Sequence, residues 1–116
     1  MVKVYFYNYL KYENEPEDDP YRGLCFYTHN KDRVKETKKI VSELLKNDSN
    51  YIRVADVHTD SLDMAFMLTN NVDHSWHMNL GVDIHHHYGR SSMVGDIFEL
   101  DGKKFIVMST GFEEVE

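Results

Sequence analysis

The sequence has few cysteines, few prolines and no excess of basic residues. Cys25 is the only cysteine among 116 residues. It can form neither an internal disulfide nor a cysteine-rich metal site, which favours a reducing, cytoplasmic setting. No stretch approaches the roughly 18 apolar residues of a membrane span. Thirteen basic residues against twenty acidic ones give a net charge of −7, so general binding to nucleic-acid phosphates is not expected.

The chain has the size and composition of one folded domain. A length of 116 residues with 41% hydrophobic residues is enough to bury a core without a disulfide or a metal. Eight tyrosines and six phenylalanines favour strands over a purely helical bundle. We therefore expect a single α+β domain over residues 1–116.

The strongest structural signal is a β-hairpin centred on Asp101-Gly102. An Asp-Gly pair suits a two-residue type I′ turn, in which both central residues have positive φ. Counting outward from this turn places opposite charges and aromatic rings across from each other, which stabilises a hairpin. The expected pairs are Leu100 with Lys103, Glu99 with Lys104, Phe98 with Phe105, and Ile97 with Ile106.

The other elements follow from hydrophobic periodicity. Alternation predicts strands at residues 2–8, 22–28 and 51–59, and helical spacing predicts helices at residues 31–46 and 61–69. Asp60 is the expected N-cap of the second helix, whose broad stripe of Met64, Met67 and Leu68 predicts burial on more than one side. Residues 72–88 are predicted to be an irregular loop, and Gly111-Phe112-Glu113 to lead into an acidic tail. The expected fold is a mainly antiparallel sheet of about five strands with two helices packed on one face.

Histidines supply the clearest chemical signal. The predicted loop holds Trp76 and five of the seven histidines, and imidazoles bind zinc and other first-row metals. His74, His77, His85 and His87 are the candidate ligands for zinc or another divalent metal. Their spacing matches no defined metal motif, so a histidine-rich loop without a metal role is the favoured interpretation, and no cofactor is required.

Arg90 and Ser91 lie between this loop and the hairpin and permit two readings. Guanidinium and hydroxyl groups can hold a phosphate or a carboxylate, or Arg90 can pair with an acid of the same fold. Ser91 and Ser92 follow His87 closely, but the G-x-S-x-G setting of a nucleophilic serine is absent. No catalytic residue is predicted.

The second half of the chain contains several short motifs in a fixed order. These are Asp60-Ser61-Leu62-Asp63, Leu68-Thr69-Asn70, Trp76, Asn79, Gly81-Val82, Arg90-Ser91, Val94-Gly95-Asp96 and Gly111-Phe112-Glu113. In order and spacing, residues 54–114 resemble small proteins of phages and plasmids, and the C-terminal half is similar to YodL-like domains of mobile elements. Two features depart from that pattern: Met93 stands where a serine is usual, and the run His85–His87 is additional.

The resemblance implies a mobile-element origin and no established enzymatic activity. It also implies that Trp76, Asn79, Arg90, Ser91 and Asp96 form one shared surface or structural knot, which is the predicted binding site. The leading hypothesis is a small non-enzymatic accessory protein that binds a host or element-encoded protein, with modulation of host defence as one role. The alternatives are a metal-dependent hydrolase or nuclease that uses the histidine loop, and a nucleic-acid mimic or small-anion binder centred on Arg90 and Ser91. The sequence leaves homo-oligomerisation open.

Overall fold

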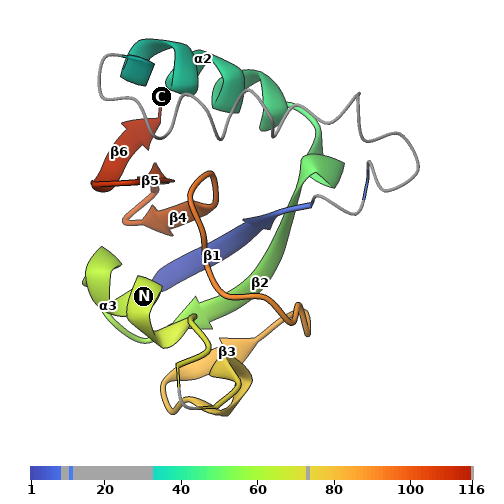
Figure 1. The fold of residues 1–116 in the computed structure, drawn as a ribbon, viewed down its shortest axis with the longest axis vertical. Helices are drawn as coiled ribbons and strands as arrows, with labels where there is room; N and C mark the ends of the chain where they lie inside the picture. Colours follow the sequence, from blue (N-terminus) through green and yellow to red (C-terminus); the bar gives the residue numbers. More distant parts are fainter. Residues whose placement is uncertain (9–10, 12–32, 73, 116) are drawn as a thin grey trace.

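A computed structural model of the chain describes residues 1–8, 11, 33–72 and 74–115. These residues form a six-stranded sheet of strand order β3-β2-β1-β4-β5-β6, in which every neighbouring pair is antiparallel (Figure 1). The predicted α+β class is confirmed, with six strands where about five were expected. The strands are β1 (Val2–Tyr7), β2 (Tyr51–Val57), β3 (Val82–Ile84), β4 (Ile97–Leu100), β5 (Lys103–Met108) and β6 (Gly111–Val115). The helices are α2 (Val34–Leu44) and α3 (Leu62–Leu68), with short 3₁₀ helices η4 (Asp48–Asn50) and η5 (Trp76–Met78).

The β4–β5 hairpin has the predicted turn and register. All four expected cross-strand pairs are present, from Leu100 with Lys103 to Ile97 with Ile106. Asp101 and Gly102 have φ values of 54° and 77°, as a type I′ turn requires. The local turn chemistry and the side-chain pattern therefore determine this hairpin together.

The two helices lie on opposite faces of the sheet, whereas the sequence predicted both on one face. Ala65 of α3 belongs to a buried cluster with Val4 and Phe98. Val41 of α2 belongs to a separate cluster with Ile97. Because Ile97 and Phe98 are consecutive on β4, their side chains point to opposite faces. Both faces of the central strands are apolar, so each face needs its own helix.

Several element boundaries differ from the prediction. Ser61, and not Asp60, caps α3, because its side chain accepts a hydrogen bond from the Met64 amide. The stretch predicted as an irregular loop contains η5 and β3, and β3 pairs with β2. The expected acidic tail is the edge strand β6. The predicted strand at residues 22–28 lies outside the described residues, as does the start of the helix predicted from residue 31.

The part of the chain that the structure describes contains no helix long and apolar enough to cross a membrane.

Candidate functional site: a buried polar network beside an apolar patch

A buried ion pair between Arg90 and Asp96 joins the segment before β4 to strand β1. The Asp96 carboxylate is fully buried. It accepts hydrogen bonds from Arg90 Nη1 at 2.8 Å and Arg90 Nη2 at 2.7 Å. It also accepts from the backbone amides of Tyr7 and Met93, each at 2.8 Å. Burial raises the pKa of the Asp96 carboxyl, while the guanidinium and the two amides oppose that rise. This arrangement is the internal pairing that was one of the two readings of Arg90.

Arg90 makes further contacts that leave little of it available to a ligand. Its guanidinium also donates to the carbonyl oxygens of Tyr7 at 3.1 Å and Ser91 at 3.0 Å. Its central carbon lies 4.3 Å from the centre of the Phe6 ring, a distance at which a cation is attracted to the ring. The side chain is only 15% exposed. Arg90 therefore ties β1 to the segment that precedes β4.

Trp76 is the second anchor of this network. It is fully buried, and its indole N–H donates to the Arg90 carbonyl oxygen at 2.8 Å. Asn71 accepts from the Trp76 amide at 2.9 Å, and its own amide N–H donates to Ser91 Oγ at 2.8 Å. The predicted binding residues Trp76, Arg90, Ser91 and Asp96 thus belong to one connected network, with Asn71 as a member that the sequence analysis missed. In the sequence, the only indication of a role for Asn71 is that it closely follows the helix predicted at residues 61–69.

Asn79 connects η5 to the end of α3. Its side-chain N–H donates to the Leu68 carbonyl oxygen at 2.7 Å, and its side-chain oxygen lies 2.7 Å from His74 Nε2. Thr69 and Ser92 make a buried hydroxyl contact that joins the end of α3 to the segment before β4. The network therefore holds α3, η5 and the segment before β4 in fixed relative positions, and it does so with groups that are mostly turned inward.

The four histidines predicted as metal ligands do not form one group: the rings of His77 and His87 are in contact, whereas His74 and His85 contact other residues. His77 Nε2 contacts the Tyr88 carbonyl oxygen at 3.1 Å, and its ring centre lies 5.1 Å from that of His87. His74 contacts Asn79, and His85 contacts Asp56 at 2.9 Å. Within the described residues, no three His, Cys, Asp or Glu side chains are grouped as a metal site would need. The metal-dependent hydrolase or nuclease remains a prediction.

Two aspartate–histidine pairs lie on one face of β2 and β3. Asp56 and Asp83 are direct cross-strand partners, and like charges in that position destabilise a sheet. His85 contacts Asp56, and His58 Nε2 lies 2.6 Å from Asp83. Arg53 donates three hydrogen bonds of 2.6–3.1 Å to Asp56. Burial raises the pKa of Asp56, but the hydrogen bonds from Arg53 and His85 outweigh it, so its pKa lies below 3.8.

A hollow of about 320 Å³ lies between the end of α2 and the sheet. Tyr51, Arg53 and Lys104 contribute polar groups to its lining. Two of them are already engaged: the Tyr51 hydroxyl donates to the Gly95 carbonyl oxygen at 2.9 Å, and Arg53 pairs with Asp56. Both contacts are made within the protein, and Tyr51 and Ile97 of this lining belong to the buried cluster that contains Val41.

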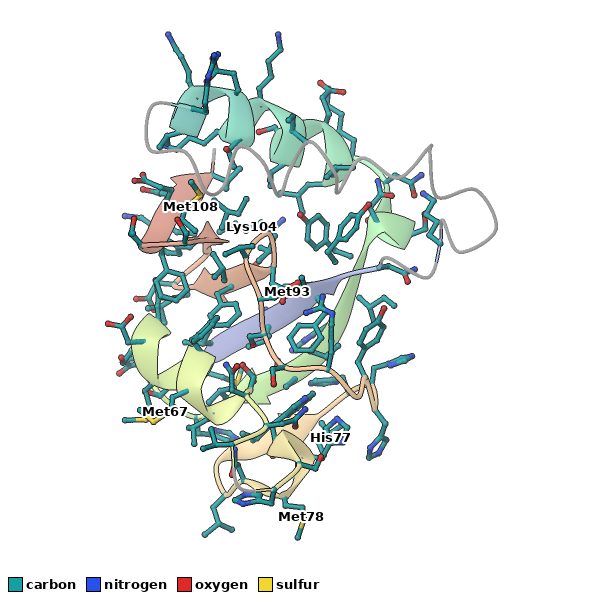
Figure 2. All side chains as sticks on the ribbon, viewed as in Figure 1. Met67, His77, Met78, Met93, Lys104 and Met108 are labelled. Carbon is teal, nitrogen blue, oxygen red and sulfur yellow. The ribbon has the colours of Figure 1, made fainter. Side chains whose placement is uncertain are left out.

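The other end of the molecule carries an apolar patch on α3 and the segment around η5. Met67, Val72, Met78 and Leu80 are 57, 75, 72 and 93% exposed, and we call these four residues the apolar patch. Figure 2 shows Met67 and Met78 at the same end of the molecule, on its outer surface. A hollow of about 210 Å³ lies here, lined by Met67, Leu68, Asn70, Val72, His74 and Asn79. The expectation that α3 is buried on more than one side is therefore wrong for Met67, which faces outward.

Charge is distributed unevenly around this patch. Residues 54–89 contain no Lys or Arg, and they include five aspartates and six of the seven histidines. This segment, which we call the cation-free segment, includes α3, η5 and β3. Helix α2 lies at the opposite end of the molecule (Figure 1) and carries Lys35, Lys38 and Lys39. The apolar patch thus lies within a segment that carries aspartates and no lysine or arginine.

Comparison with known protein families, curated proteins and solved structures finds no match for this chain. The similarity to phage and plasmid proteins therefore stays a prediction from sequence motifs.

Proposed function

We propose that this chain is a small accessory protein that acts by binding another protein and has no catalytic role. The observation that carries the proposal is the apolar patch. Each of its four side chains is more than half exposed. Met67 and Val72 line one hollow together with Asn79, the residue between Met78 and Leu80. Exposed apolar side chains that gather on one part of a surface commonly mark a protein-interaction site.

The buried network supports this proposal by making the patch rigid. Trp76 and Asn79 fix η5, and Asn71 joins it to the segment before β4. A preorganised surface loses less conformational entropy when it binds. The predicted binding residues therefore act by positioning the surface residues Met78 and Leu80, which flank Asn79 in the chain.

The polar groups at the predicted site are arranged for structure rather than for chemistry. The only strongly basic group there, Arg90, is paired with Asp96, and Ser91 Oγ accepts from the Asn71 amide. On the sequence resemblance alone, we extend the proposal to a host or element-encoded partner, with modulation of host defence as the role such an origin suggests.

Quantitative affinity capture tests the proposal. The untagged protein is captured by antibody from cells that express it, because an added histidine tag would be confused with the native His85–His87 run. The same capture is done with Met78→Ser/Leu80→Ser and with a control, Lys35→Ser/Lys39→Ser, on α2. We expect a stoichiometric protein that the patch variant loses and the control retains. A folded patch variant that retains every stoichiometric protein captured by the wild type would overturn the proposal.

A further inference from the structure

We infer that the apolar patch receives a basic, amphipathic segment of the partner protein. This inference rests on the proposed function and names the chemistry of the partner. Apolar side chains of the segment would contact Met67, Val72, Met78 and Leu80, while its lysines or arginines would face the surrounding aspartates.

The apolar half of the inference comes from the size and composition of the surface. The hollow lined by the end of α3, Val72 and Asn79 has a volume of about 210 Å³, below the roughly 300–1,000 Å³ of sites that bury a small molecule. It is suited to apolar side chains inserted from a larger partner. Two of the four patch residues are methionines, whose flexible thioether side chains adapt to varied apolar shapes. Amphipathic helices dock into surfaces of this kind through spaced apolar anchors.

The expectation that the partner segment is basic comes from the charge around the patch. Asp60 precedes the N-cap of α3, Asp63 lies in the first turn of α3, and the Asp60 side chain is 95% exposed. Asp83 on β3 is 66% exposed. Asp60 lies 3.3 Å from the N-terminal ammonium, and Asp83 lies 2.6 Å from His58 Nε2. The cation-free segment itself supplies no lysine or arginine beside these carboxylates. An acidic or phosphate-bearing partner would be repelled at this end, whereas a basic segment places cations beside exposed carboxylates.

The fold strengthens this complementarity by separating the charges. The lysines of α2 lie at the far end of the molecule (Figure 1), and exposed charges separated by more than about 10 Å are largely screened at 0.1 M salt. The α2 lysines share their helix with Glu36 and Glu43, and Lys38 pairs with Glu113. They therefore do little to cancel the acidic field around the patch. A basic segment approaching this end meets carboxylates and apolar side chains together.

Two synthetic peptides provide the direct test. One is a 15-residue amphipathic helix of leucine and lysine, and the other has the same leucine pattern with glutamate in place of lysine. Fluorescence anisotropy of each labelled peptide gives its Kd for the full chain at low salt and at 0.3 M salt. We expect the lysine peptide to bind at least ten-fold more tightly than the glutamate peptide, and we expect its affinity to fall as salt rises.

Matched variants show whether the patch carries this binding. Met78→Ser/Leu80→Ser and Asp60→Asn/Asp63→Asn are each expected to weaken the lysine peptide roughly ten-fold, as loss of central interface contacts does. Glu43→Gln/Glu114→Gln changes the net charge by the same amount on α2 and β6 and is expected to stay within about two-fold. Circular dichroism confirms that each variant is folded.

Three outcomes would overturn the inference. These are equal binding of the two peptides, an equal effect of the control and aspartate variants, or a folded patch variant with unchanged affinity. The proposed function is judged separately, by the capture experiment. A captured partner that needs the patch but contacts it with an acidic segment would preserve the proposed function and overturn this inference.

Discussion

Replacing Asp96 with alanine should be among the most damaging single changes in this protein. The substitution removes a fully buried carboxylate that accepts four hydrogen bonds, two from Arg90 and one each from the amides of Tyr7 and Met93. Breaking a buried ion pair by removing one partner costs about 3–5 kcal/mol. Loss of the acceptor for a buried amide costs about 1–3 kcal/mol, and these contributions overlap. We therefore expect Asp96→Ala to lower the free energy of unfolding by about 3–5 kcal/mol, a large part of the roughly 5–15 kcal/mol of a typical domain.

Urea unfolding followed by circular dichroism at pH 7 measures this loss. Asp96→Asn keeps the shape and provides a milder variant if the alanine form does not fold. The control is Glu43→Ala, which breaks the exposed Glu43–Lys46 pair and should change stability little. A double-mutant cycle with Arg90→Met should show that the two losses are not additive, because both changes break the same pair. A loss under about 1 kcal/mol for Asp96→Ala would refute the structural role given to this pair.

Three further predictions concern the sheet and the histidines. Asp56→Asn should destabilise the fold at pH 7, and its stability difference from wild type should shrink as the pH falls below 3.8, because the lowered pKa of Asp56 stabilises the fold only while the carboxylate is ionised. Urea midpoints at pH 7 and pH 3 measure this difference, and a difference that stays constant would contradict the prediction. Gly102→Ala should lower the free energy of unfolding by about 1–2 kcal/mol, because φ is +77°, although a Cβ there would meet no atom within 4 Å. Thermal unfolding measures this loss, and an unchanged Tm would refute the expected backbone strain of alanine at this position. His85→Ala/His87→Ala should leave the zinc content of the purified protein unchanged by elemental analysis, whereas loss of stoichiometric zinc from a folded variant would support the metal-dependent alternative.

The sequence was most informative where local and cross-strand signals agreed. Asp101-Gly102 determined a turn, and the pairs around it agreed with that turn, so the register of β4 and β5 was predicted correctly. Strands β1 and β2 were found for a similar reason, since their apolar side chains follow strand periodicity. In each case, the interactions that define the element lie within or beside it in the chain.

The errors came from features that depend on tertiary contacts. Strand β3 has only three residues and forms an edge by pairing with β2, so its own pattern is too short to distinguish it from a loop. In β6, Glu113 and Glu114 suggested a solvated tail, but the strand is held by β5. The placement of the helices on opposite faces also depends on long-range packing, because periodicity shows which face of a helix is apolar and not which face of the sheet it covers.

The candidate site was predictable in part. The resemblance grouped Trp76, Arg90, Ser91 and Asp96, which the structure joins in one network. It did not reveal that this network is internal, since burial depends on the fold around it. The exposure of Met67 was hidden for the same reason, because an apolar residue in a helix is normally expected to face the core.

Site-specific photo-crosslinking in cells tests the central claim most directly. A benzophenone amino acid is placed at position 80 in the apolar patch and, in a separate variant, at position 39 on the outer face of α2. Irradiation followed by mass spectrometry identifies any protein that lies against each position. The proposed function predicts a discrete adduct with one protein from position 80 and none from position 39. If position 80 gives no adduct, or the same adducts as position 39, the apolar patch is not a protein-binding surface.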